Sequence, residues 1–309
     1  MLAMVNTPGG VAPVEIREFG EPSPNLDEAI VEVRAFSLNR GELALLEMRR
    51  EGWRPGQDVS GVVVTEAADG SGPRVGSRVV GLVDEAGWAQ RVAVPTFRLA
   101  VLPEEVSFAA AAALPIAGLT ALRALRVGGD LLGRSVLVTG ASGGVGRFAV
   151  QLAARAGARV AGVVGRPERC EGLRELGAAE VVTRAEDAEG PFDLILESVG
   201  GASLKAAMRF VAPGGTIVVF GNSSGESADF GFFGFDLTKL YPEGARLQLF
   251  FFASGTESFG ADLVRLVALV EDGNLGPHVG AEKTWREFGP VANALRERRI
   301  AGKAVFRVD

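Results

Sequence analysis

The pattern of hydrophobic and polar positions divides the chain into regions of different character. Through the first hundred residues, apolar and polar positions alternate in short runs separated by turn-forming sequences such as E-P-S-P-N and A-D-G-S-G-P. Short alternating runs bounded by Gly, Pro, Asn and Asp are typical of β-strands. The runs are Ile30–Ala35, Gly61–Glu66, Arg78–Leu82 and Ala89–Val94. With little helical sequence between them, they predict a small β-barrel-like domain.

From Phe108 onward the pattern changes to apolar strands that alternate with helical segments. A helix-rich segment, Ala109–Val127, comes first. The strands expected after it are Ser135–Thr139, Arg159–Val164, Glu180–Val182, Asp193–Glu197, Thr216–Phe220 and Leu247–Phe252. Strands separated by helices pair in parallel, so this region predicts an α/β fold with a doubly wound sheet.

The C-terminal part is mixed in character. It predicts a helix at Gly260–Glu271, a loop to Lys283, a helix at Phe288–Arg298 and a final strand at Lys303–Val308. A C-terminal strand can close the N-terminal barrel by pairing with the strands of that barrel. We therefore expect a discontinuous barrel domain, residues 1–115 and 255–309, with a nucleotide-binding domain, residues 116–254, inserted into it.

A glycine-rich turn lies between the first predicted parallel strand and its helix, where residues 136–151 read VLVTGASGGVGRFAVQ. Gly140 can make the tight turn, Gly143 leaves no Cβ to block phosphates, and Gly146 lets the helix pack on the strand. A dinucleotide pyrophosphate would then meet free helix N–H groups and a dipole of roughly +0.5 charge. The contacts expected at the turn are Ser142, Gly143, Gly144 and Val145. Ala141 departs from the strict G-x-G-x-x-G pattern, so an ordinary glycine-rich turn is the alternative.

Composition narrows the possible functions. The 309 residues carry a net charge of −6 and no basic block, which argues against nucleic acid as a partner. Because Cys170 and His278 are the single cysteine and histidine, no intramolecular disulfide is possible and a zinc site would rely on carboxylates. His278 lies in a Pro-Gly flanked loop and is interpreted as an ordinary loop residue. No uncharged apolar stretch reaches the ~18 residues of a membrane span, and the N-terminus lacks signal-peptide features, which favours a cytoplasmic protein.

Several spaced motifs together resemble a known family. They are P-G-Q-D-V-S-G-V-V at 55–63, V-G-S-R-V-V-G-L at 75–82, A-A-A-L-P-I-A-G-L-T-A at 111–121, G-A-S-G-G-V-G at 140–146, P-G-G-T-I-V-V-F-G-N-S-S-G at 213–225 and G-K-A-V-F-R-V at 302–308. The chain resembles the medium-chain dehydrogenase/reductase superfamily, specifically its zinc-free quinone oxidoreductase-like branch. The resemblance implies a GroES-like β-barrel domain, a Rossmann domain, NADPH, a homodimer and hydride transfer to a small-molecule quinone or α,β-unsaturated carbonyl. Zinc-dependent members carry a cysteine after the strand near residue 35 and a G-H-E motif, where this chain has Gly56, Gln57 and Asp58.

The residues after the second parallel strand bear on the choice of cofactor. An NAD site usually places Asp or Glu there to hold the ribose hydroxyls. Here the strand is followed by Gly165, Arg166, Pro167, Glu168 and Arg169. A guanidinium can grip a phosphate through two hydrogen bonds, so this sequence favours the 2′-phosphate of NADPH. The resemblance adds Arg184. The alternative is three solvated arginines with a relaxed preference, and Glu168 could reach the ribose.

The resemblance implies further cofactor contacts from the ends of other strands. They are Thr120, Ser198, Val199, Phe220, Gly221, Asn222, Ser223, Phe250, Phe251 and Phe252. Thr120 and Phe250–Phe252 would approach the nicotinamide, Phe220–Ser223 would meet the adenine-side ribose and phosphates, and Ser198 and Val199 end the fourth strand. The alternative for the phenylalanines is a buried strand or an edge strand used in dimerisation.

Candidate catalytic residues are few. Asn39 matches an asparagine of the family and could donate to a carbonyl or orient the nicotinamide; the alternative is a residue that caps the short helix from Gly41. Asp58 is interpreted as a structural acceptor between domains. Relatives often place tyrosines five and about eleven residues beyond the asparagine, where this chain has Ala44 and Arg50. The single tyrosine, Tyr241, is a weak candidate for the proton donor. The alternative is that Tyr241 is a packing residue and that water supplies the proton.

Three functions are compatible with these residues. The first is an NADPH-dependent reductase of a quinone or activated double bond. The second is an enoyl or ketone reductase of a biosynthetic pathway. The third is a non-catalytic NADPH-binding sensor or scaffold, which the missing tyrosines allow.

Overall fold

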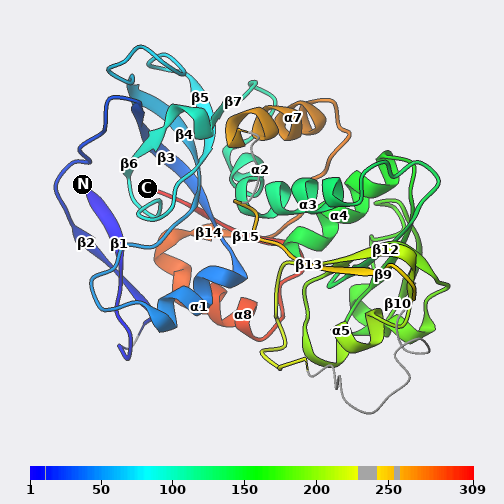
Figure 1. The fold of residues 1–309 in the computed structure, drawn as a ribbon. Helices are drawn as coiled ribbons and strands as arrows, with labels where there is room; N and C mark the ends of the chain where they lie inside the picture. Colours follow the sequence, from blue (N-terminus) through cyan, green and yellow to red (C-terminus); the bar gives the residue numbers. More distant parts are fainter. Residues whose placement is uncertain (11, 229–241, 254–257) are drawn as a thin grey trace. The chain divides into compact units, whose positions relative to one another are not determined.

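The computed structural model describes residues 1–10, 12–228, 242–253 and 258–309 (Figure 1). The described residues form two compact units, Met1–Leu119 with Thr256–Asp309, and Thr120–Gly255. Tyr241 lies outside the described residues. Over the described ranges, none of the helices has both the length and the apolar character needed to cross a membrane.

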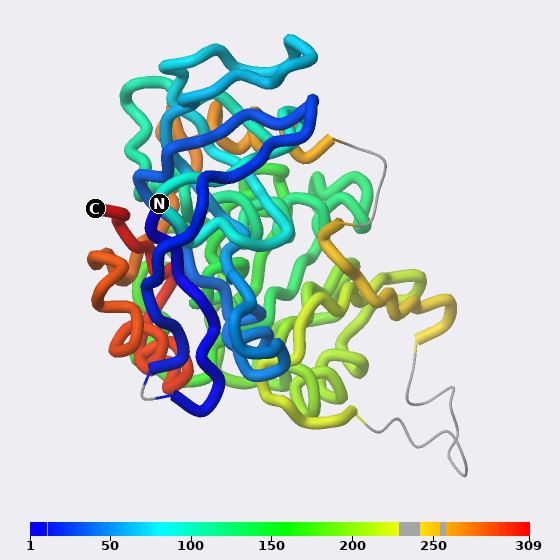
Figure 2. Tube along the Cα trace, turned by 90° about the vertical axis from the view of Figure 1, so that its left-hand side faces the viewer, coloured from blue at the N-terminus to red at the C-terminus, as the bar shows by residue number. Residues whose placement is uncertain are grey.

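The first unit is built on a mostly antiparallel seven-stranded sheet. Its strands follow the order β14-β15-β3-β4-β5-β7, with β6 paired to β3 (Figure 1). Their bounds are β3 Glu28–Leu38, β4 Asp58–Thr65, β5 Arg78–Leu82, β6 Arg91–Pro95, β7 Leu99–Val101, β14 Val279–Thr284 and β15 Lys303–Arg307. A separate hairpin pairs β1 (Leu2–Asn6) with β2 (Val14–Glu18), which run side by side at the blue end of the tube in Figure 2.

The C-terminal strand joins the N-terminal strands, as the sequence predicts. Ala304 of β15 lies opposite Leu38 of β3 in an antiparallel ladder. The loop predicted up to Lys283 is wrong, because Val279–Thr284 forms β14 and pairs in parallel with β15. This segment is the edge of the sheet and its residues are half-buried or exposed, so it lacks the apolar run that marks a central strand.

Four large aromatic side chains fill the core of this unit. Phe36, Trp88, Phe288 and Phe306 form a chain of ring contacts with centroids between 4.8 and 5.5 Å apart, and all four are essentially buried. Two of them, Phe36 and Phe306, come from neighbouring strands. Each such ring buries a large apolar surface, so this cluster fixes the position of the C-terminal strand in the sheet.

Helices in the first unit lie at the ends and flanks of the sheet. They are α1 Arg40–Met48, α2 Phe108–Ala112, α7 Phe259–Glu271 and α8 Phe288–Arg296, with short 3₁₀ turns η1 Thr96–Arg98 and η4 Trp285–Glu287. The helix predicted over Ala109–Val127 is divided into α2 and α3 (Pro115–Val127). Pro115 has no N–H and disfavours a helical residue before it, so it begins a new helix.

The second unit holds a six-stranded sheet in which all pairs are parallel. Its order is β10-β9-β8-β11-β12-β13. The strands are β8 Ser135–Thr139, β9 Arg159–Val163, β10 Ala178–Val182, β11 Phe192–Glu197, β12 Val211–Val219 and β13 Arg246–Leu249. The helical segments described between them are α4 Gly144–Arg155, η2 Pro167–Arg169, η3 Ala185–Asp187 and α5 Gly201–Ala207. In chain order this is the 3-2-1-4-5-6 arrangement of Rossmann folds.

Candidate functional site

The glycine turn occupies the connection between β8 and α4. Gly140 has φ +62°, a conformation that favours glycine, and the N–H of Gly143 closes the turn onto the Gly140 carbonyl at 2.9 Å. A Cβ on Gly146 would lie 2.3 Å from the Gly140 oxygen and 2.6 Å from the Ala141 Cα. A Cβ on Gly143 would meet the Gly140 oxygen alone, at 3.2 Å. Gly146 therefore permits close packing, whereas Gly143, which caps α4, keeps the helix N-terminus open.

The turn lies where the order of the sheet reverses. β9 is on one side of β8 and β11 is on the other, so the carboxyl ends of β8 and β11 meet at the topological switch point. The hydroxyl of Thr139 accepts from the Ser198 N–H at 2.9 Å, and the Ser198 hydroxyl donates to the Thr139 carbonyl at 3.1 Å. These bonds join the predicted contact Ser198 to Thr139, which directly precedes the glycine turn.

The segment after β12 runs alongside the end of β11. The N–H of Phe220 donates to the Glu197 carbonyl at 3.0 Å, and the N–H of Ser223 donates to the Ser198 carbonyl at 3.0 Å. Gly221 lies so close that a Cβ there would be 3.1 Å from the Ser198 oxygen. The structure therefore brings the predicted residues after β11 and β12 together on one edge of the sheet.

Glu197 supports this edge, although sequence reasoning gave it no role. Its fully buried carboxylate accepts from the Thr139 hydroxyl at 3.1 Å, the Ser203 hydroxyl at 2.9 Å and the Gly200 N–H at 3.0 Å. These donors satisfy the carboxylate without a cation and hold the residues that follow β11. The signal in the sequence is an acid at the end of the apolar strand F-D-L-I-L-E.

The predicted arginines follow two neighbouring strands. Gly165, Arg166 and Arg169 lie in the connection after β9, and Arg184 follows β10, which pairs with β9. Arg166 is exposed, and Arg184 makes a long ion pair with Glu186 at 3.7 Å. Sequence reasoning missed Arg147 of α4, whose side chain is buried and donates to the Glu171 carbonyl at 3.2 Å.

The residues predicted to approach the nicotinamide lie on α3 and after β13. Thr120 is buried in α3, and Arg123, less than one turn further, donates to the Phe252 carbonyl at 3.0 Å. The strand expected to reach Phe252 ends at Leu249, because its neighbour β12 ends at Val219 and the N–H of Phe250 makes the last ladder bond to that residue.

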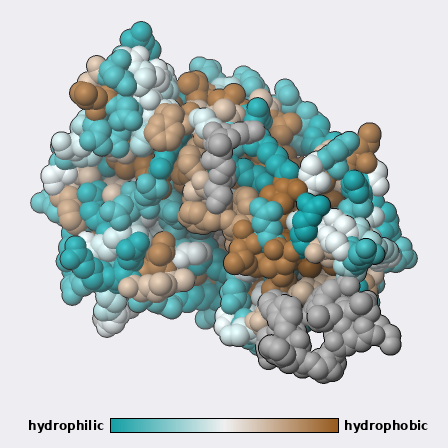
Figure 3. All heavy atoms as spheres, in the orientation of Figure 1, coloured by the Kyte–Doolittle hydropathy of each residue, from teal (hydrophilic) through white to brown (hydrophobic). Residues whose placement is uncertain are grey.

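The edge strand β13 leaves apolar side chains uncovered. Leu247, Leu249 and Phe251 are 41%, 79% and 63% exposed. Figure 3 shows hydrophobic residues gathered over this strand. An exposed edge with apolar side chains favours pairing with another chain.

Asn39 belongs to a buried polar cluster in the first unit. Its amide nitrogen donates to Asp58 Oδ2 at 2.8 Å and to Glu42 Oε2 at 3.2 Å, while its oxygen accepts from the Lys303 ammonium. Asp58 Oδ2 also accepts from the Ser37 hydroxyl at 2.5 Å and from Lys303 at 3.3 Å. Both amide hydrogens of Asn39 are therefore engaged by carboxylates in this arrangement.

Asn39 also precedes α1 directly, and Glu42 ties it to that helix. The Glu42 carboxylate accepts from the Asn39 N–H at 2.8 Å and from the Gln57 N–H at 3.0 Å. Asp58 Oδ1 accepts from the Ile116 N–H at 2.9 Å. Asp58 therefore joins the start of β4 to the first turn of α3 within the first unit.

The acidity of Glu42 is strongly perturbed. Complete burial raises the pKa of Glu42 to about 8, and the nearby Asp58 carboxylate acts in the same direction. The hydrogen bonds from Asn39 and the charge of Lys303 oppose this rise. The buried cluster thus contains two acids, Glu42 and Asp58, and one base, Lys303. Glu42 is the group that takes up a proton.

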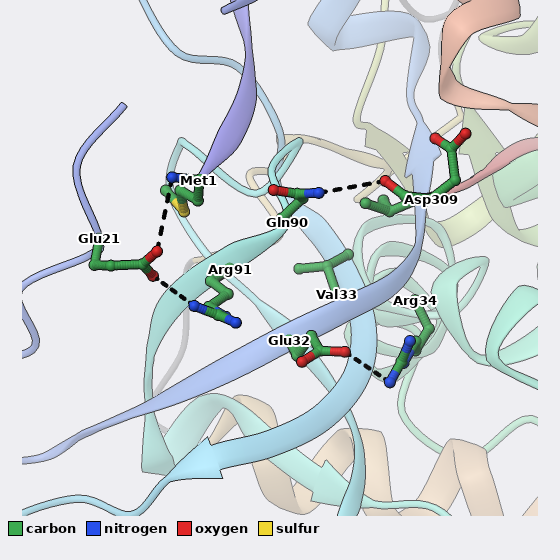
Figure 4. Close-up of a pocket in the computed structure, with 9 residues that line it drawn as sticks. Met1, Glu21, Glu32, Val33, Arg34, Gln90, Arg91 and Asp309 are labelled. Atoms are coloured by element: carbon green, nitrogen blue, oxygen red, sulfur yellow. Dashed lines mark hydrogen bonds and ion pairs between the residues drawn. The ribbon is translucent and has the colours of Figure 1, made fainter. Parts of the chain in front are cut away.

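A hollow of about 350 Å³ lies in the first unit where both chain termini are found (Figure 4). Its charged residues pair with one another: Glu21 with Arg91 at 3.0 Å, and Glu32 with Arg34 at 2.6 Å. None of the residues predicted to bind the cofactor lines this hollow.

The chain is similar to a known protein family, to curated proteins and to solved structures. The model of the zinc-binding dehydrogenase family matches residues 144–268. A chloroplast envelope quinone oxidoreductase homologue of Arabidopsis thaliana is 35% identical over 217 residues, which are 65% of this chain and 64% of that protein. The structure of Escherichia coli quinone oxidoreductase complexed with NADPH superposes with a TM-score of 0.87 and 21% identity, covering 99% of this chain and 100% of that one.

The chain belongs to the medium-chain dehydrogenase/reductase superfamily. Within it, the chain falls in the quinone oxidoreductase-like branch. Another similar protein, the spectinabilin polyketide synthase system protein NorB of Streptomyces orinoci, is 33% identical over 293 residues, or 89% of this chain and 13% of that protein. The chain thus spans less than two thirds of either of these curated relatives. The fold of this superfamily combines a Rossmann domain, seen here in the second unit, with a GroES-like domain, seen in the first.

Proposed function

We propose that the chain is an NADPH-dependent oxidoreductase that reduces a quinone or an α,β-unsaturated carbonyl without a metal ion. The observation that carries the proposal is the glycine turn at the switch point of the parallel sheet, with arginines after β9 and no acid between Val163 and Arg166. NADPH, when bound, supplies the hydride. The acceptor is an electron-poor carbon of the small-molecule substrate.

The residues of the second unit fit such a cofactor. The first N–H groups of α4, at Gly144, Val145 and Gly146, have no partner within the helix and can donate to a pyrophosphate. Gly143, the N-cap of α4, carries no side chain that could block a phosphate there. Ser198 and Gly221 pack closely on the adjoining edge, and we propose that a ribose lies beside these small residues.

The remaining side chains of the proposed site bind and orient. Arg166, Arg169 and Arg184 are proposed to hold the 2′-phosphate, and Thr120 and Phe250–Phe252 to pack beside the nicotinamide. Asn39 is held by Glu42, Asp58 and Lys303, so its proposed part is positioning, and water delivers the proton to the reduced product. This assignment follows from the engagement of both amide hydrogens.

The residue counts support a metal-free reaction. The single cysteine, Cys170, lies within the region that matches the zinc-binding dehydrogenase model, and the single histidine, His278, lies outside it. Zinc in enzymes of this chemistry is held by cysteine and histidine ligands. The zinc-binding dehydrogenase family therefore includes chains, such as this one, that have few ligands for zinc.

An enoyl or ketone reductase of a biosynthetic pathway is the second candidate. It is favoured by the similarity to the polyketide synthase protein, which extends over 89% of this chain. Both candidates use the same cofactor and differ in the acceptor, which is a free quinone or enone in one and a thioester-bound intermediate in the other.

Turnover with a panel of acceptors tests the proposal. NADPH oxidation would be followed with quinones, enones and enoyl thioesters, using the whole chain and an Arg166→Met variant. Arg209→Met is the matched control, since Arg209 is an exposed arginine of the same unit. Activity with a quinone or enone supports the first candidate, and activity confined to enoyl thioesters supports the second. Tight binding of NADPH without turnover of any acceptor would instead indicate a sensor or scaffold.

A further inference from the structure

We propose that Arg147 of α4 is a specificity-determining residue that binds the 2′-phosphate of the cofactor together with Arg169. The inference rests on the proposed function, since it presupposes that a dinucleotide binds at the glycine turn. It adds a residue from the helix itself to the arginines of the connection after β9.

The position of Arg147 links the two parts of the proposed cofactor site. Its N–H donates to the Gly143 carbonyl at 3.0 Å, so it lies one turn into the helix whose N-terminus faces the pyrophosphate. Its side chain extends to the connection after β9, where it donates to the Glu171 carbonyl at 3.2 Å. One guanidinium nitrogen is 3.5 Å from where a Cβ of Gly172 would lie, so the guanidinium packs directly on this backbone.

The guanidinium of Arg147 is largely buried, and Glu171, the acid that acts on its charge, forms no ion pair with it. The residue is 7% exposed, and its Nε–H has no hydrogen-bond partner. Among the residues that the structure describes, no carboxylate forms an ion pair with it. A buried charge that is not paired with an anion is costly, and a bound anion would remove this cost.

The charge of a second guanidinium, that of Arg169, acts on Arg147. Burial lowers the pKa of Arg147, and the charge of Arg169 lowers it further, while Glu171 acts in the opposite direction. Arg169 is therefore close enough for the two cations to repel one another. A phosphate dianion between them would replace this repulsion with attraction and give the Nε–H an acceptor.

The place of this pair in the fold indicates which phosphate it would bind. In Rossmann folds the pyrophosphate lies at the helix N-terminus and the adenosine ribose lies at the end of the second strand. Here the second strand is β9, and its following connection carries Arg169 and packs on Arg147. The anion that reaches this point is the phosphate on the 2′-oxygen of that ribose, which NADPH has and NADH lacks.

Calorimetric titration of the whole chain with NADPH and NADH tests the inference, using Arg147→Met and the control Arg155→Met. Arg155 lies on the same helix and is exposed. We expect the Arg147→Met variant to lose at least about tenfold in NADPH affinity, or about 1.4 kcal/mol, with NADH affinity within about twofold of the wild type. The control should retain both affinities. Adenosine 2′,5′-bisphosphate and AMP, which differ in the 2′-phosphate alone, should show the same selective loss.

Other results would overturn the inference in distinguishable ways. An equal loss of both affinities would show that Arg147 supports the fold of the connection and does not read the phosphate. Unchanged affinities would exclude it from the site. If the methionine variant does not fold, Arg147→Lys keeps the charge without the two-pronged geometry and should show a smaller loss confined to NADPH. If the wild type binds neither nucleotide, the proposed function fails and the inference fails with it.

Discussion

The buried acid Glu42 should make the stability of the first unit depend on pH in an unusual direction. The pKa of Glu42 rises from its ordinary 4.5 to about 8 in the folded protein, chiefly because burial disfavours the charged carboxylate. Between these values the folded state holds a proton that the unfolded state has released. The free energy of unfolding therefore falls as the pH rises through this range, and the stabilising effect of the protonated acid is lost above pH 8.

The size of the effect follows from the pKa difference. At about 1.4 kcal/mol for each pH unit, the rise from 4.5 to 8 corresponds to about 5 kcal/mol as an upper figure. Other perturbed carboxyls do not obscure it. Asp69 and Asp193 have lowered pKa values, so their contribution is complete above the ordinary pKa and constant at higher pH.

Urea unfolding at about pH 5.5 and about pH 9 measures this dependence. The variants are Glu42→Gln, which cannot ionise, and Glu47→Gln, which removes an exposed acid from the same helix. The wild type and Glu47→Gln should lose several kcal/mol between the two pH values, whereas Glu42→Gln should lose much less. An equal decrease in all three proteins would refute the conclusion that Glu42 holds a proton in the folded state.

Four further outcomes are expected. Gly146→Ala should lower the free energy of unfolding by about 1–3 kcal/mol, because its Cβ would lie 2.3 Å from the Gly140 oxygen. Gly41→Ala, at a helical glycine of α1 whose Cβ position has no atom within 4 Å outside its chain neighbours and its own helix backbone, should raise it by up to about 1 kcal/mol; equal melting curves would contradict this. Prolonged dialysis against EDTA should leave NADPH oxidation unchanged, and a loss restored by zinc would contradict a metal-free reaction. Leu249→Asp on the exposed edge β13 should convert a dimer to a monomer in light-scattering measurements, and an unchanged mass would exclude this edge as the interface.

The parallel sheet could be predicted well because its strands are buried on both faces. Such strands read as continuous apolar runs with glycine-rich or polar ends. The strand predicted at Ser135–Thr139 has those bounds in the structure, and the strand predicted at Asp193–Glu197 begins one residue earlier. The edge strand β14 was missed because half-buried, partly charged residues carry no such signal.

The local part of the candidate site could also be predicted, whereas its supporting contacts could not. The glycine turn is recognisable because each glycine meets a steric demand within seven residues of chain. Lys303 reaches Asn39 across 264 residues, and Arg147 reaches the Glu171 carbonyl through the packing of α4 against the connection after β9. These contacts depend on tertiary structure, and neither residue type nor spacing reveals them.

Titration of the whole chain with NADPH and with NADH under identical conditions tests most directly whether the glycine turn and the arginines beside it hold NADPH. NADPH should bind saturably and at least about tenfold more tightly than NADH, a difference of about 1.4 kcal/mol in binding free energy. Tenfold tighter binding of NADH, or no saturable binding of NADPH, would contradict this expectation.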